Sequence, residues 1–372
     1  MQGCPGALPG QPSFCIRKKS NIPVSPVRKG IRKMIVGIKH AILHILDANS
    51  GVTVYSDKEL DVSDAGINSF ITKHIDKVCE GAGLRKGEFN KNSGFLYHLK
   101  EYLEPVEEER DLQSLSLFIA EKIYEGISSA ENTESCDILV CDCNINETPT
   151  LAVLKCDNKI GYTHQVLQED GTVRNNLINH YAILPSTSQR ISECAFINET
   201  DYSIKYMGRK RKIDGENVDL IADFLLECVF DLSPKEAIHA VSKIAKKVTE
   251  ENGGDSIETS ARIKQYVVEN IEENDFEYIE PEKIAETVFD GRPVMKEEFI
   301  EKIKDAAVPE QVEVTNYVTK KMTSNIKITT DIGVELSFPA EYYRDNKYIE
   351  ILNNDDGTIS IRINNINEMT NK

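Results

Sequence analysis

Apolar residues between Cys136 and Met207 alternate with other residues at a period of two, and this pattern constrains the fold most strongly. Such alternation is typical of β-strands, whose successive side chains point to opposite faces of a sheet. The gaps between the alternating segments are too short to hold the crossover helices that parallel neighbours require. The pattern therefore predicts an antiparallel meander, with strands at Ile138–Cys143, Thr150–Cys156, Ile160–Gln168, His180–Leu184, Ser192–Ile197 and Tyr202–Met207.

Segments with helical spacing of apolar residues lie on both sides of this meander. Those before it surround Ser63–Glu80, Ser93–Leu103 and Leu112–Ser129, after an opening strand that begins at Ile35. After the meander, Val218–Phe230 has apolar residues on one side. Ser233 then begins a further helix, because a serine cap precedes proline at the first turn and glutamate three residues after the cap.

The C-terminal part contains shorter helical segments and then returns to strands. The helices are expected near 256–272, 281–289 and 296–307, and the clearest hairpin spans Tyr348–Ile363 around an Asp-Gly turn. We therefore predict the α+β class, with an N-terminal region of mixed helices and antiparallel sheet and a C-terminal helical region closed by β-hairpins. Five residues are expected to be buried: Leu139, Val153, Leu225, Ile238 and Ile351.

The chain of 372 residues is long enough for two domains. We predict an α+β domain with the strand meander at 34–230, and a helical region with C-terminal hairpins at 231–372. Residues 1–33 contain seven basic residues, no acidic residue and five prolines, and they are expected to form a disordered basic extension. Two interpretations remain open for them: an arm for nucleic acid, or, as we prefer, a start assigned too early for a protein that begins at Met34.

Charge and hydropathy exclude several classes of protein. The chain has 61 acidic and 44 basic residues and a formal net charge of −17, which argues against binding nucleic acid with the whole surface. A local basic site remains compatible with this charge, because binding depends on where the cations lie. No apolar run approaches the roughly 18 residues that a membrane-spanning helix needs, so no membrane association is expected.

The nine cysteines do not have the spacing of a metal site, since no Cys-x-x-Cys pair occurs. Cys141 and Cys143 are expected to project from the same strand face as Leu139 and to be buried, reduced thiols. A zinc site formed by Cys136, Cys141, Cys143 and Cys156 is conceivable, but we reject it in favour of buried strand cysteines. We predict no metal and no cofactor.

Motifs of known enzymes are mostly missing, because the chain has no Walker loop, no Gly-x-Ser-x-Gly and no His-Glu-x-x-His. The most serious catalytic alternative is a metal-dependent nuclease built on the predicted hairpin of 138–156. Asp142 and Lys155 have about the right order for it, but Val153 occupies the place of the second carboxylate and cannot bind Mg²⁺. We therefore predict that the protein is not an enzyme.

The one concentrated basic feature spans residues 205–212, where five cations occur within eight residues. Such a segment can neutralise several phosphates of a nucleic acid. The alternative is a solvated connector whose charges balance acidic neighbours. The predicted DNA-binding residues are Lys205, Arg209, Lys210, Arg211 and Lys212.

The order of these features resembles the bacterial nucleoid-associated protein family of the NdpA/YejK type. The resemblance begins with Ile38–His44, continues through the hairpin Asp137–Cys156, and is most specific at Lys205–Lys212 followed by Asp223–Leu225. It covers about residues 34–368, including the strands from Ile326 to Ile363. The chain departs from the family pattern by the insertion of 213–217 between the basic segment and the following helix, which puts an exact transfer of binding positions in doubt.

The resemblance implies a non-enzymatic protein of the bacterial nucleoid, located in the cytoplasm. DNA is the expected partner, contacted directly or indirectly, and nucleoid proteins are possible partners. The residues themselves suggest contact with the phosphate backbone through 205–212, without any identifiable readout of base edges. Two alternatives stay open: a protein-interaction module recruited to the nucleoid by another protein, and the nuclease described above.

Overall fold

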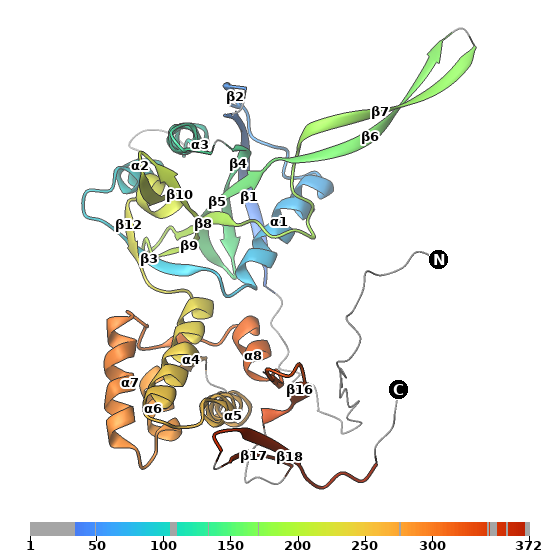
Figure 1. Cartoon of the computed structure of the whole chain (residues 1–372). Coiled ribbons are helices and arrows are strands. Elements are labelled where there is room, and N and C mark those ends of the chain that lie inside the picture. The colour runs from blue at the N-terminus through green and yellow to red at the C-terminus, as the bar shows by residue number, and fades with distance from the viewer. Residues whose placement is uncertain are drawn as a thin grey trace. The chain divides into compact units, whose positions relative to one another are not determined.

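The computed structural model describes residues 34–48, 50–104, 110–132, 134–169, 171–274, 277–340, 342, 348–354 and 356–368. These residues divide between Ser233 and Pro234 into two compact units, which we call the N-terminal unit and the C-terminal unit (Figure 1). The basic extension predicted for residues 1–33 lies outside the described residues. Among the helices that the structure describes, none is long and apolar enough to cross a membrane.

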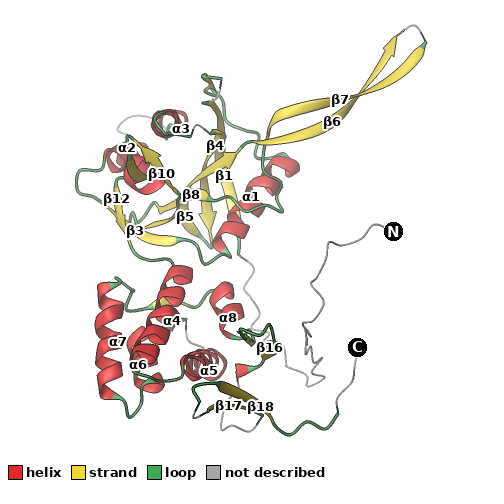
Figure 2. Ribbon diagram, in the orientation of Figure 1, coloured by secondary structure: helices red, strands yellow, loops and turns green. Residues whose placement is uncertain are grey.

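The N-terminal unit is built on an eight-stranded antiparallel sheet in the order β12-β3-β9-β8-β5-β4-β1-β2. Strands are yellow in Figure 2. In this order β4 and β5 are neighbours, as are β8 and β9, but the two predicted strands between β5 and β8 are not part of this sheet. The α+β class predicted from the sequence is confirmed. The strands are β1 (Val36–Asp47), β2 (Val52–Val54), β3 (Arg85–Phe89), β4 (Ser135–Ile145), β5 (Thr148–Asp157), β8 (Glu193–Asn198), β9 (Ile204–Met207) and β12 (Cys228–Phe230).

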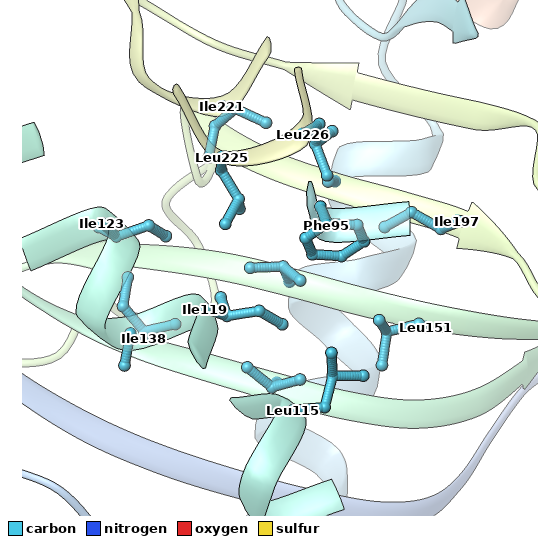
Figure 3. Close-up of a cluster of buried hydrophobic side chains, with 14 of the residues drawn as sticks. Phe95, Leu115, Ile119, Ile123, Ile138, Leu151, Ile197, Ile221, Leu225 and Leu226 are labelled. Carbon is cyan, nitrogen blue, oxygen red and sulfur yellow. The ribbon is translucent and has the colours of Figure 1, made fainter. Parts of the chain in front are cut away.

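Helices cover both faces of this sheet, because the central strands bury side chains on both sides. On β4, Leu139 belongs to the apolar cluster under α1 (Ala65–Cys79). Its neighbour Ile138 belongs to the opposite cluster, shown in Figure 3, which also holds buried residues of three helical segments. These segments are α2 (Gly94–Leu103), α3 (Leu112–Ser128) and the π-helix η1 (Leu220–Leu226).

The strand cysteines are divided between the same two clusters. Cys141, Cys143 and Cys156 are buried on the α1 side with Leu139, whereas Cys136 lies in the opposite cluster. The four thiols of the conceivable zinc site therefore do not share a face of the sheet. Burial raises the pKa of Cys136 and of Cys143 to about 12 each, which keeps these thiols protonated at neutral pH.

Strands β6 (Lys159–Glu169) and β7 (Thr172–Ile183) pair only with each other and form a ribbon that projects from the N-terminal unit (Figure 1). We call this ribbon the arm. The strand predicted at His180–Leu184 is much too short, because β7 begins at Thr172. Most side chains of the arm are exposed on both faces, so burial did not impose an apolar period on residues 172–179.

The helix predicted at Val218–Phe230 is largely wrong. Residues 216–219 instead form β11 (Glu216–Asp219), which pairs with β10 (Lys210–Ile213), and only η1 is helical. Glu227 has a left-handed backbone with φ of 51° and ends η1, after which β12 joins the edge of the sheet. The apolar residues of 218–230 have helical spacing, but the segment forms the end of β11, the short helix η1 and the strand β12.

The C-terminal unit contains a group of helices and three small pairs of antiparallel strands, two of which are hairpins. Ile238 is buried on α4, as predicted, whereas Ile351 is only half-buried because β17 pairs with a single strand. The helices are α4 (Pro234–Glu251), α5 (Ser256–Asn274), α6 (Pro281–Val288), α7 (Pro293–Asp305) and α8 (Asn316–Met322). The hairpins pair β15 (Ile326–Thr329) with β16 (Glu335–Phe338) and β17 (Ile349–Asn353) with β18 (Ile359–Ile363). The third pair joins β13 (Tyr278–Ile279) to β14 (Val312–Glu313) across α6 and α7.

Gly126 lies where α3 packs closely against η1, so a substitution there measures how tight this packing is. A Cβ at this position would lie 2.3 Å from Cδ1 of the buried Leu220 and 3.2 Å from Cδ1 of Phe224. Gly126→Ala gains about 1 kcal/mol of helix propensity, but overpacking costs about 1–3 kcal/mol. We expect a net loss of about 1 kcal/mol in the free energy of unfolding, measured by urea denaturation.

The matched control is Gly94→Ala at the start of α2, where the nearest atom to an added Cβ is 3.9 Å away. This variant should be neutral or slightly more stable than the wild type. A stabilised Gly126→Ala variant would contradict the close packing of α3 on η1.

Candidate nucleic-acid interface

The basic segment 205–212 contains the last three residues of β9, a two-residue connection and the first three residues of β10. Gly208 is required at this turn, because an added Cβ would lie only 2.1 Å from Oδ1 of the buried Asp219. Asp219 cannot easily move, since this same oxygen accepts hydrogen bonds from the backbone N–H groups of Ile221 and Ala222. The backbone at Gly208 therefore passes directly beside the carboxylate of Asp219, which caps η1.

Strand alternation divides the cations of this segment into two sets. Arg209 and Arg211 point towards carboxylates, and the side chain of Arg211 is only 11% exposed. Lys210 and Lys212 are exposed. On β9, Ile204 and Tyr206 lie in the apolar core, so Lys205 between them projects from the opposite face and is exposed.

Arg209 and Arg211 belong to a network of ion pairs around the fully buried Lys155 and Glu193. We call it the root network, because β5 leads into the arm directly after it. The ammonium Nζ of Lys155 lies 2.9 Å from Oε2 of Glu193 and 3.2 Å from Oε2 of Glu134, and it also contacts Asp157. The six members are Glu134, Lys155, Asp157, Glu193, Arg209 and Arg211.

The arginines complete the root network. Arg211 donates to both carboxylate oxygens of Glu193 at 2.8 Å each, the two-pronged geometry that makes arginine–carboxylate pairs strong. Arg209 donates to Asp157 at 2.8 Å and to Glu193 at 3.2 Å. Burial alone would raise the pKa of Glu193, but the hydrogen bond from Arg211 and the charge of Lys155 outweigh it and lower the pKa to about 2.

Three carboxylates of the root network could in principle hold a metal ion. Oxygens of Glu134, Asp157 and Glu193 lie within 4.8 Å of one another. However, the ammonium of Lys155 and the guanidinium groups of Arg209 and Arg211 already contact these same carboxylates. Three cations match three anions, so the cluster has no excess negative charge to attract a further cation.

Asp142 and Lys155, the residues of the nuclease alternative, belong to separate clusters. Asp142 accepts hydrogen bonds from Lys39 and from the hydroxyl of Tyr102, both at 2.8 Å, and lies 3.4 Å from Arg110. In the register of β4 and β5, Lys155 pairs with Ile138, four residues along the strand from Asp142. Four residues of strand span about 13 Å, so these two side chains do not converge on one site.

The three lysines of the basic segment remain available to an anion. Within the described residues, no ion pair or side-chain hydrogen bond involves Lys205, Lys210 or Lys212. Lys205 faces Lys86 directly across the β3–β9 pair. Like charges at directly opposed positions of a sheet repel each other.

Comparison with known families identifies the chain. The sequence profile of a family described as nucleoid-associated protein YejK matches residues 42–370. The chain belongs to the nucleoid-associated protein YejK family. The resemblance inferred from the order of motifs is confirmed, although none of the curated proteins compared with the chain matches it.

This family member carries a second group of lysines, in the C-terminal unit, that the sequence analysis missed. Lys264 on α5 donates to the backbone oxygens of Ser324 and Asn325 just after α8, at 2.5 and 3.2 Å. Burial lowers the pKa of Lys264, and the nearby charges of Lys321 on α8 and Lys246 on α4 lower it further.

We call these residues, with two further exposed lysines, the helix lysines: Lys243, Lys246, Lys264, Lys320 and Lys321. In the part of the chain that the structure describes, no carboxylate pairs with any of them. They lie on three helices that pack against one another, and the charges of Lys246 and Lys321 act on Lys264, so no continuous stretch of sequence reveals the group. The only hint of this group in the sequence is the spacing Lys243-x-x-Lys246-Lys247, which places these lysines on the polar face of α4.

Glu193→Gln should be strongly destabilising, because it leaves buried cations without their main carboxylate. We expect the free energy of unfolding at pH 7 to fall by about 3–5 kcal/mol, measured by urea denaturation. Glu216→Gln on the exposed β11 is the control and should change it by less than about 0.5 kcal/mol.

The lowered pKa of Glu193 also predicts that the stability difference between the wild type and Glu193→Gln depends on pH. The folded pKa of Glu193 lies below its ordinary value of 4.5, at about 2, so its stabilising contribution is complete above pH 4.5 and disappears as the pH falls towards 2. The difference in stability between wild type and Glu193→Gln should therefore shrink over this interval. A difference that stays constant from pH 5 to pH 2.5 would show that the ion pairs contribute nothing.

Proposed function

We propose that this protein binds the DNA backbone directly and without catalysis, at the bacterial nucleoid in the cytoplasm. The family assignment supports a nucleoid role, and the separation of Asp142 from Lys155 argues against the nuclease. The observation that carries the proposal is the division of the basic segment. Arg209 and Arg211 pair with carboxylates of the root network, whereas Lys205, Lys210 and Lys212 are exposed and have no carboxylate partner among the described residues.

The proposed contact is electrostatic and independent of sequence. Lysine ammonium groups bind phosphates as point charges and do not by themselves distinguish bases. Each phosphate neutralised releases counterions, so affinity must fall as salt rises. The net charge of −17 restricts such contact to places where cations gather without matching anions.

Replacement of Lys205, Lys210 and Lys212 by alanine tests the proposal without disturbing the root network. Each phosphate contact contributes about −0.9 to the slope of log affinity against log salt, so three lost contacts flatten the slope by about 2.7. Gel-shift titrations across salt concentrations should show this change equally on unrelated DNA sequences. Replacing Arg211 as well would confuse the result, since it would also destabilise the fold.

The control variant replaces three exposed lysines elsewhere in the N-terminal unit, namely Lys58, Lys73 and Lys91. It removes the same net charge and should alter the slope much less. Equal slopes for the wild type, the test variant and the control would reject direct contact through the basic segment. Recruitment by another nucleoid protein, which the acidic net charge favours, would then be the better function.

The helix lysines are the proposed second contact. The double variant Lys246→Ala/Lys321→Ala should flatten the salt slope by about 1–2, because it removes two unmatched cations. The matched control is Lys283→Ala/Lys304→Ala, since these lysines pair with Glu280 at 2.9 Å and with Glu282 at 3.2 Å. If both double variants give the same slope, the helix lysines do not contact DNA.

A further inference from the structure

Beyond its base, the arm carries its exposed apolar side chains on one face, and each of them is paired with a polar side chain. Paired residues of an antiparallel ribbon point to the same side, and the side alternates from one pair to the next. We call the face with the following four pairs the mixed face: Tyr162–Asn179, His164–Leu177, Val166–Asn175 and Gln168–Val173. Each pair sets an apolar side chain beside an amide or an imidazole, and none of the eight residues is acidic.

The apolar members of the mixed face are strongly exposed: Tyr162 by 72%, Val166 by 59%, Val173 by 63% and Leu177 by 79%. On the opposite face, the apolar residues Leu167 and Ile178 are half-buried instead. An isolated two-stranded ribbon is marginally stable in water, and a contiguous exposed apolar surface usually marks an interaction site. The mixed face therefore requires a partner.

The chemistry of the mixed face matches the edge that A·T base pairs present in the major groove. The amides of Asn and Gln can bond both N6 and N7 of adenine, and apolar side chains contact the 5-methyl group of thymine. A pair such as Val166–Asn175 offers both kinds of group side by side. A G·C pair has no methyl group in the major groove, and no base pair shows one in the minor groove. The face therefore fits A·T pairs read from the major groove.

The dimensions of the arm also fit this groove. Its two strands lie about 4.8 Å apart, and the major groove, about 12 Å wide, admits a two-stranded ribbon, whereas the minor groove is only about 6 Å wide. Successive pairs of the mixed face are two residues apart, which is about 6.8 Å along a strand. Base pairs follow one another at about 3.4 Å, so each pair of residues meets every second base pair.

The base of the arm adjoins the basic segment. Asp157, at the end of β5, accepts a hydrogen bond from Arg209 at 2.8 Å, and the exposed Lys159 begins β6 two residues later. Lys210, which follows Arg209, is exposed. Phosphate contacts fix the register of a protein on a duplex, while contacts in the groove distinguish the bases. Lysines bound to phosphates here would hold the arm beside the same duplex.

We propose that the arm enters the major groove of DNA and that its mixed face contacts A·T base pairs. This inference rests on the proposed function, to which it adds a preference among base pairs. The basic segment contacts the phosphates of any sequence, and the arm adds contact with base edges. Because the chain carries a net charge of −17, a projecting ribbon (Figure 1) with no acidic residue on its contact face suits an approach to DNA.

Replacing thymine by uracil in the DNA tests this contact with the unaltered protein. The change removes the 5-methyl group from the major groove and leaves the minor groove as it was. The full chain is titrated, by fluorescence anisotropy at one salt concentration, with a short duplex of mixed sequence and with its uracil form. Burial of one methyl group contributes about fourfold in affinity, so two contacts predict roughly sixteenfold weaker binding of the uracil form. A control duplex with inosine in place of guanine is altered only in the minor groove and should bind like the unmodified duplex.

Protein variants test whether the mixed face makes the contact. Val166→Ala/Leu177→Ala shortens two of its apolar side chains, so the difference between the thymine and uracil forms should fall below about fourfold. The salt slope, which depends on the lysines, should not change. The matched control is Thr163→Ala/Gln165→Ala, which shortens two exposed side chains on the opposite face and should keep the full difference.

The outcomes separate this inference from the proposed function. If the wild type binds both forms equally and with the salt slope expected of the basic segment, the arm does not read the groove, while the backbone contact stands. An arm that instead binds another protein gives this same result. A wild type that binds no duplex rejects both ideas. A control variant that loses the difference, or a test variant that keeps it, would overturn the role of the mixed face.

Discussion

The ion pair between Lys155 and Glu193 is the interaction on which much of the N-terminal unit depends. Both side chains are fully buried, and their nitrogen and oxygen lie 2.9 Å apart. A buried charge without a partner costs several kcal/mol, so each of the two makes the other necessary. Because Lys155 is on β5, Glu193 on β8 and the bidentate Arg211 on β10, the pair joins the central sheet to the β10–β11 hairpin.

This requirement explains why the cations of the basic segment fall into two sets. A strand presents alternate residues to opposite sides, so Arg209 and Arg211 reach the carboxylates while Lys210 and Lys212 remain exposed. The two positions that face the carboxylates carry arginine, whose planar guanidinium can bond both oxygens of a carboxylate. The other positions carry lysine, whose point charge suits the proposed contact with phosphate. The residue types thus agree with the two environments.

The sequence predicted those parts of the fold in which burial enforces a period. Leu139 and Val153 lie on strands covered on both faces, and the start of α4 after Ser233 follows from local capping chemistry. Residues 172–179 could not be assigned to β7, because a ribbon exposed on both faces needs no alternation. Within the candidate site, the sequence predicted where the cations gather, but not that Arg211 is paired internally. Its partner Glu193 is 18 residues away, and only the folded sheet brings them together.

The acidic charge of the chain also governs how exposed lysines can act. At physiological ionic strength the Debye length is about 8 Å, so a phosphate beside the basic segment interacts mainly with the lysines it touches. At 0.01 M salt the Debye length is about 30 Å, and the repulsion from the −17 net charge reaches the same phosphate. Low salt therefore strengthens both the local attraction and the long-range repulsion. The proposed binding of DNA therefore depends on the arrangement of a few unmatched cations, and the net charge opposes it at a distance.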